Sequence, residues 1–97
     1  MPTRFEWDPA KAVANLQKHL VSFEIAMRVF SDPLARTVQD RIEGHEQRWQ
    51  TLGMVEGVLL LLVAHSQWED GDIDVIRIIS ARRATPAERR RYEQGHN

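Results

Sequence analysis

The stretch Asp74-Val-Ile-Arg-Ile-Ile-Ser-Ala-Arg-Arg-Ala84 predicts a β-strand that ends in a basic turn. Four of its residues are β-branched, as strands prefer, namely Val75, Ile76, Ile78 and Ile79. Because side chains alternate along a strand, Arg77 is expected on the same face as Val75 and Ile79. A charged group inside an apolar strand needs a partner or water, since burying it alone costs several kcal/mol. The stretch therefore predicts a strand with a polar contact at its centre.

Three arginines lie within seven residues of this stretch, namely Arg77, Arg82 and Arg83. The planar fork of N–H donors on a guanidinium group matches the oxygens of a phosphate. We therefore interpret the end of the strand as an anion site. The alternative is that Arg77 pairs with a nearby carboxylate and that the other two arginines are solvated. The strand alone is compatible with both interpretations.

The composition indicates a single domain, residues 1–97, with a modest core and no cysteine. The lack of cysteine excludes disulfides, thiolate metal sites and a cysteine nucleophile. The longest apolar run, residues 58–64, is far shorter than the ~20 residues that span a bilayer. The N-terminus has no apolar signal region, so a cytoplasmic location without membrane contact is expected. The net charge of −1 gives no overall attraction to nucleic acid, but residues 77–97 hold six arginines and two glutamates, which predicts a local basic face.

Three helices are predicted from their start signals. Asp8 is a favoured N-cap and Pro9 suits the first helical position, so the first helix should run to about His19. A second helix is expected from Ser22 to about residue 30, and a third over residues 86–94, where Thr85 opens a capping box. The apolar stripe of the first helix is expected at Val13, Leu16 and Leu20.

The remaining segments alternate or are continuously apolar, which predicts strands. The run 58–64 is apolar throughout and should be a central strand that is covered on both faces. Turns are expected at residues 40–44 and 53–57, and an acidic loop at 66–72. These elements predict an α+β fold, with two N-terminal helices packed on a mainly antiparallel sheet of four to five strands and a C-terminal helix. The strands are expected at residues 5–7, 34–39, 46–52, 58–64 and 74–81.

Three blocks of residues in this order resemble the BrnT family of bacterial toxins. The resemblance extends over nearly the whole chain, with two small departures: Leu20 stands where the family often has glycine, and the residues after Tyr92 are variable. The first block is Phe5-Glu-Trp-Asp8, Lys11, Asn15, Lys18-His19, Ser22-Phe23 and Ala26; the second is Asp32-Pro33, Glu46, Arg48 and Gly53; the third is Arg77-Ile-Ile-Ser-Ala-Arg82, Ala84, Glu88-Arg89 and Tyr92.

The resemblance implies a fold similar to the RelE/ParE toxins. It also implies a ribonuclease that blocks translation when it is free, and a cognate BrnA-like, DNA-binding antitoxin that neutralises it in a hetero-oligomer. Toxins of this type usually cut RNA without a metal or other cofactor, by attack of the 2′-OH on the adjacent phosphate. Such chemistry needs a base, an acid and cations that stabilise the extra charge on phosphorus.

The residues that are candidates for this catalysis are Arg77 and Arg82 as a phosphate clamp, with Arg48 completing the site. Glu46 is a candidate base, or else a salt-bridge partner that holds Arg48 or Arg77. His19 is the better acid–base candidate by its ordinary pKa, or else a cation that stabilises the end of the first helix.

Further candidates for RNA binding are Lys18, Arg83 and Tyr92. Solvation is the alternative for Lys18, and packing on the sheet is the alternative for Tyr92. His45 and His65 have no partner at a metal-ligand spacing, so no metal site is expected. Two other classes of function stay open, a non-catalytic module that binds nucleic acid or protein, and a purely structural interaction domain.

Overall fold

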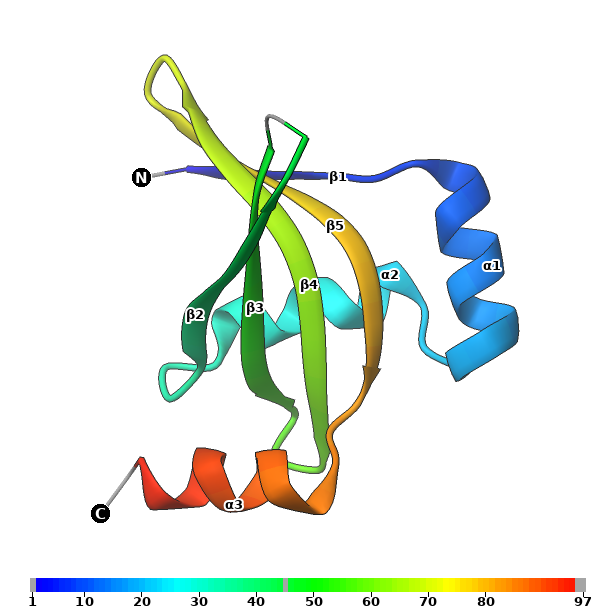
Figure 1. The fold of residues 1–97 in the computed structure, drawn as a ribbon, viewed down its shortest axis with the longest axis vertical. Coiled ribbons are helices and arrows are strands. Elements are labelled where there is room, and N and C mark those ends of the chain that lie inside the picture. Colours follow the sequence, from blue (N-terminus) through cyan, green and yellow to red (C-terminus); the bar gives the residue numbers. More distant parts are fainter. Residues whose placement is uncertain (1, 45, 96–97) are drawn as a thin grey trace.

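The computed structural model describes residues 2–44 and 46–95, which form a five-stranded mixed sheet with helices on both faces (Figure 1). The strand order is β1-β5-β4-β3-β2, with β1 parallel to β5 and the other neighbours antiparallel. No helix in the described residues is long and apolar enough to cross a membrane. The elements are β1 (Thr3–Glu6), α1 (Pro9–His19), α2 (Phe23–Ala26), the 3₁₀ helix η1 (Met27–Ser31), β2 (Arg36–Glu43), β3 (Glu46–Val55), β4 (Leu59–Asp70), β5 (Ile73–Arg83) and α3 (Pro86–Gln94).

The helix start signals are confirmed. The Asp8 side chain accepts a hydrogen bond from the backbone of Ala10, and Ser22 does the same for Ile25. Thr85 and Glu88 form the predicted capping box at the start of α3. Each cap satisfies backbone donors that the first helical turn leaves without an internal partner.

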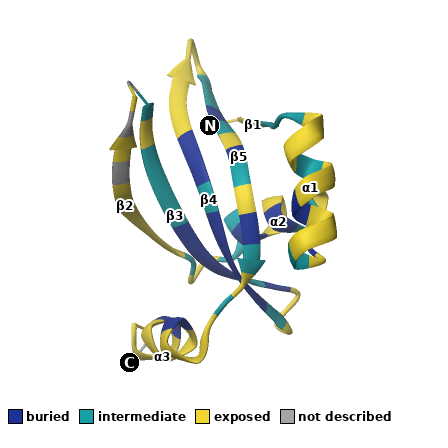
Figure 2. Ribbon diagram, turned by 45° about the vertical axis from the view of Figure 1, so that its right-hand side comes forward, coloured by how far each residue is buried: buried dark blue, intermediate teal, exposed yellow. Residues whose placement is uncertain are grey.

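The main core lies between the sheet and the N-terminal helices. Buried apolar residues from α2, η1, β3, β4 and β5, with Val21 before α2, form one cluster, and Figure 2 shows buried segments along β4 and β5. The contact between η1 and β3 is close, because a Cβ atom at Gly53 would lie 2.8 Å from the Cβ atom of Val29. The cluster consists of Val21, Phe23, Ala26, Val29, Val55, Leu61, Val63, Ile78 and Ala81.

A second, smaller core lies on the opposite face, where α3 crosses one end of the sheet (Figure 1). Tyr92 packs there against Leu52, Leu60 and Leu62. Leu60 and Leu62 are buried on this face while Leu61 and Val63 are buried on the other. This confirms that β4 is a central strand covered on both faces.

The side of α1 that faces the sheet differs from the prediction. Val13, Leu16 and Leu20 are all exposed, and the buried residue of this helix is Asn15. The Asn15 carboxamide donates to the carbonyl groups of Val21 and Ala81 and accepts from the Ala81 N–H. The Asn15 side chain thus satisfies the backbone N–H and C=O groups of Ala81, as a neighbouring strand would. These groups lie beyond the four residues of β5 that pair with β1.

The strands are longer than predicted, and all three expected loops are misplaced. Residues 40–43, where a turn was expected, continue β2. Gly53 lies within β3, and the turn comes at residues 56–58. The expected acidic loop continues β4 as far as Asp70, with a tight turn at residues 71–72. Pairing across a hairpin here outweighs the poor strand preference of acidic residues and glycine.

The β4–β5 ladder contains one irregularity that changes which side chains share a face. Ala64 pairs with Ser80, but the next residue of β4, His65, pairs with Ile78, so Ile79 is an extra residue. Arg77 shares a face with Val75 as predicted, whereas Ile79 does not continue the simple alternation. Because of this bulge, Arg77 and Ser80 lie on the same face although they are three residues apart.

Candidate functional site

Two of the predicted arginines lie on the face of the sheet that carries α3, beyond the end that the helix covers. Arg77 of β5 pairs with Ser66 of β4 in the ladder. On β3, Gln50 pairs with Ala64, and Arg48 lies two residues before Gln50. Continuing that register places Arg48 beside Ser66. Ser66 on β4 thus lies between Arg48 on β3 and Arg77 on β5. Neighbouring strands in a sheet are roughly 5 Å apart.

Each of these arginines has a carboxylate nearby. The Arg77 Nη1 atom lies 4.0 Å from the Glu6 Oε1 atom, and the Arg48 Nη2 atom lies 3.9 Å from the Glu46 Oε2 atom. Of the two partners considered for Glu46, the structure places Arg48 beside it, while Arg77 lies near Glu6. Sequence reasoning missed Glu6, because β1 pairs with β5 in a parallel register that brings Glu6 opposite Arg77.

The two arginines differ in their burial. The Arg48 side chain is 19% exposed and the Arg77 side chain 45% exposed. At 4.0 Å the Arg77–Glu6 contact is too long for a hydrogen bond, and in the described part of the chain Arg77 donates none. Its guanidinium N–H groups therefore face solvent, where an anion can reach them.

Arg82 occupies a different environment from the predicted basic turn. It lies within β5, pairs with Leu62 in the ladder, and binds Glu88 with Nη1–Oε1 and Nη2–Oε2 distances of 2.8 and 2.9 Å. Hydrogen bonds from the Arg82 guanidinium group lower the pKa of Glu88 to about 2. This effect outweighs burial, which acts to raise that pKa. The donors of Arg82 are engaged in holding α3 onto the end of the sheet. The Arg82 side chain is 39% exposed, but it is not merely solvated, because α3 brings Glu88 over the strand as its partner.

Arg83 and Tyr92 lie apart from the Arg48–Arg77 pair. Arg83 pairs with Leu61 in the ladder and so belongs to the opposite face of the sheet. Tyr92 is buried against the smaller core, as the packing interpretation expects, and its hydroxyl donates to the Asp32 carboxylate at 2.6 Å. Burial and this bond raise the pKa of Tyr92 to about 12.

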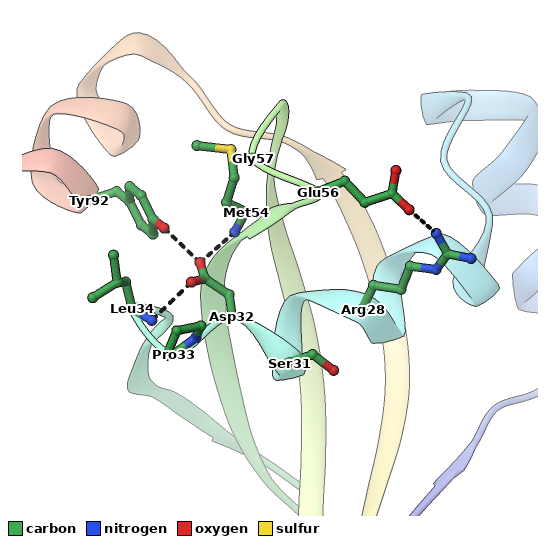
Figure 3. A pocket seen from close by; sticks show the side chains of 9 residues that line it. All are labelled: Arg28, Ser31, Asp32, Pro33, Leu34, Met54, Glu56, Gly57 and Tyr92. Atoms are coloured by element: carbon green, nitrogen blue, oxygen red, sulfur yellow. Dashed lines mark hydrogen bonds and ion pairs between the residues drawn. The ribbon is translucent and has the colours of Figure 1, made fainter.

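A large open pocket of about 730 Å³ lies around Asp32, and Figure 3 shows that Tyr92 reaches into it from α3. The Asp32 carboxylate also accepts hydrogen bonds from the backbone N–H groups of Leu34 and Met54. These bonds join η1, β3 and α3. Of the predicted site residues only Tyr92 lines this pocket, so we assign the Asp32 cluster a structural role.

Lys18 and His19 line a separate groove of about 210 Å³ between α1 and the edge of β5. Ser80, which shares a face with Arg77, lines the same groove. His19 therefore lies beside the strand that carries Arg77, at its outer edge, and not between the two arginines.

His65 is a core residue. It is fully buried, its Nε2 atom lies 2.8 Å from the Thr51 hydroxyl, and its ring packs edge-on against Phe30. Burial lowers its pKa to about 4, so the ring is neutral at physiological pH. His45 lies outside the described residues. Within them, no three His, Asp or Glu side chains gather as metal ligands would.

A family model described as "Ribonuclease toxin, BrnT, of type II toxin-antitoxin system" matches residues 7–88. The chain belongs to the BrnT family. Family membership gives it the role of the ribonuclease toxin in a type II toxin–antitoxin pair, with an antitoxin as its partner.

Among solved structures, the chain is similar to the 1.1 Å crystal structure of the Brucella abortus ribonuclease toxin BrnT. The two share 21% sequence identity and a TM-score of 0.64, and the match covers 88% of this chain and 99% of that chain. This likeness confirms the α+β fold. No curated protein sequence matches the chain.

Proposed function

We propose that this toxin cleaves RNA without a metal ion, and that Arg48 and Arg77 bind the phosphate that is attacked. The observation that carries the proposal is their shared position on one face of the sheet, on either side of Ser66. Two guanidinium groups from different strands can approach one phosphate from two sides. Both are held on strands, which position a side chain more rigidly than a loop does.

The chemistry that suits this pair is transfer of the phosphate within the RNA chain. A base takes the 2′-OH proton, the 2′-oxygen forms a bond to phosphorus, and the bond from phosphorus to the 5′-oxygen breaks. The leaving 5′-oxygen takes up a proton from water, and a 2′,3′-cyclic phosphate remains on the other fragment. The arginines stabilise the extra negative charge that develops on the phosphate oxygens in the transition state.

Glu46 is our proposed base. Its side chain is 42% exposed, so an RNA hydroxyl can reach it, and it lies 3.9 Å from Arg48 on the same face. Glu6 has the corresponding position beside Arg77, at 4.0 Å. Arg82 has a positioning role, since it fixes α3 at the end of the same face through Glu88.

The experiment that tests this function is cleavage of a mixed-sequence RNA by the purified toxin in excess EDTA. We expect cleavage to continue and to yield fragments with 2′,3′-cyclic phosphate ends. Substrates with 2′-O-methyl groups should resist, because their 2′-oxygen has no proton to lose. Loss of cleavage in EDTA that a divalent ion restores would show that the reaction depends on a metal.

We propose further that the partner is a BrnA-like, DNA-binding antitoxin that covers the toxin in a hetero-oligomer in the cytoplasm. Family membership supports an antitoxin partner. Induction of the toxin alone should stop incorporation of labelled methionine and degrade cellular RNA, and co-expression of a small DNA-binding protein encoded beside it should reverse both effects. Binding of RNA without cleavage would support the alternative of a non-catalytic module.

A further inference from the structure

The groove between α1 and β5 has an unusual concentration of positive charge. The sequence contains two lysines, Lys11 and Lys18, and both line this groove together with His19. No carboxylate lines it, and within the described residues neither lysine forms an ion pair. Because the protein as a whole carries a net charge of −1, this local positive charge is not a consequence of its composition.

The groove has a rigid frame. Lys11 and Lys18 are seven residues apart, which is about two helical turns, so they project on the same side of α1 roughly 10 Å from each other. Between them Asn15 fixes the helix to β5 by three hydrogen bonds with Val21 and Ala81. The carboxamide of Asn15 is occupied by these bonds, so the polar side chains that a ligand meets in the groove are Lys11, Lys18, His19 and Ser80.

The groove also joins the face that carries the two arginines. Ser80 lines the groove, and the bulge at Ile79 puts Ser80 on the same face as Arg77. Three residues along a strand span roughly 10 Å. At the stacked rise of ~3.4 Å per nucleotide, this corresponds to about three nucleotides of a single strand.

We propose that the Lys11–Lys18 groove binds backbone phosphates of the RNA that flank the cleaved bond. The inference rests on the proposed function, because it extends the phosphate path from Arg77 over Ser80 to α1. Lysine acts as a point charge on phosphate and carries no base information, so the groove contributes affinity and leaves the choice of cleavage sequence to other residues.

The test compares the double variant Lys11→Gln/Lys18→Gln with the matched variant Arg89→Gln/Arg90→Gln, which removes two exposed charges from α3. The probe for binding is a dodecamer RNA with 2′-O-methyl riboses, followed by fluorescence anisotropy at several KCl concentrations. We expect the lysine variant to reduce the slope of log K against log[salt] by about 1.4, from about 0.7 per phosphate contact on a single strand. The α3 variant should leave the slope unchanged.

Cleavage kinetics separate this inference from the proposed function. On a long RNA the lysine variant should raise KM by about tenfold or more and leave kcat within about twofold, because the lost contacts act equally on substrate and transition state. Reductive methylation with a ¹³C label gives a second readout, since the two lysine signals should both shift when the RNA dodecamer is added.

Three results would overturn the groove as an RNA site. They are an unchanged salt slope, lysine signals that do not move with RNA, or a variant that keeps RNA affinity while it loses affinity for the antitoxin. The last result would assign the groove to acidic side chains of the partner. A wild-type protein that binds RNA through the lysines but does not cleave it would contradict the proposed function and leave the groove intact.

Discussion

Arg82 and Glu88 form a two-point ion pair between β5 and α3, with distances of 2.8 and 2.9 Å. Glu88 is buried, and its carboxylate also accepts a hydrogen bond from the backbone N–H of Thr85. The pair therefore links the N-terminal cap of α3 to the edge of the face that carries Arg77. Removing one partner leaves the polar atoms of the other without hydrogen bonds in a partly buried site, which destabilises the folded protein.

The first prediction concerns stability. Arg82→Ala should lower the free energy of unfolding by about 2 kcal/mol, since Glu88 stays buried without its charged donor. For a domain of this size, that corresponds to a fall of about 10 °C in Tm. Arg89→Ala, at an exposed position on the same helix, should change stability by less than about 0.5 kcal/mol. Equal Tm values for the two variants in calorimetry would show that the ion pair does not hold α3.

The second prediction is a pH dependence that follows from Glu88. Its pKa lies at about 2 in the folded protein and at the ordinary value of 4.5 in the unfolded chain. The contribution of the pair to stability is therefore complete above about pH 5 and is lost as the pH falls toward 2. Urea unfolding across this range should show a steeper loss of stability for the wild type than for Glu88→Gln. Parallel curves would contradict the assignment.

The third prediction uses Tyr92, the one tyrosine in the sequence. Its phenolate absorbance should appear at a pH near 12 in the native protein and near the ordinary value of 10 in denaturant. The raised pKa means that this hydroxyl stabilises the fold below pH 10 and that the contribution is lost toward pH 12. Tyr92→Phe should cost about 1–2 kcal/mol, because the Asp32 carboxylate loses one donor. A native titration midpoint near 10 would indicate that the hydrogen bond is absent.

Local sequence signals were sufficient to predict where the helices begin and which segments form the central strands. The caps at Asp8, Ser22 and Thr85, the β-branched run of β5 and the continuous apolar run of β4 each depend on neighbouring residues alone. The limits of the strands were less predictable, since Gly53 and the acidic end of β4 are held in strands by pairing partners far along the chain.

The outer side of β5 depends on contacts that no local pattern reveals. Asn15 reaches Ala81 across 66 positions, and this contact turns α1 so that Asn15 is buried while Val13 and Leu16 are exposed. Periodicity predicted the opposite face, because it ranks residues by hydrophobicity and does not detect a polar side chain that pairs with a strand edge.

The candidate site was predicted in part. Glu46 and Arg48 lie on one face of β3, as alternation predicts, and the register across β4 places Arg77 on that same face. The roles of Arg82 and Glu6 were not predictable, since the first depends on how α3 packs and the second on the parallel pairing of β1. Within the described residues, Arg77 donates no hydrogen bond and is 45% exposed. Its guanidinium group can therefore accept an RNA phosphate as a new partner.

The fourth prediction addresses that claim with a pair of variants on the same strand. Arg77→Ala should lower the rate of RNA cleavage by a hundredfold or more, as expected for a lost donor that is worth about 3 kcal/mol in the transition state. Its stability should change by less than about 0.5 kcal/mol, because the contact with Glu6 is long and exposed. Arg83→Ala removes an equal charge from the opposite face and should cut RNA at nearly the wild-type rate.

The most direct measurement is the single-turnover cleavage rate of Arg77→Ala beside that of Arg83→Ala, with thermal unfolding of both. We expect two folded proteins with the same Tm, of which Arg77→Ala is at least about a hundredfold slower. A folded Arg77→Ala protein that cleaves RNA as fast as Arg83→Ala would contradict the assignment of the Arg48–Arg77 face as the site of phosphate attack.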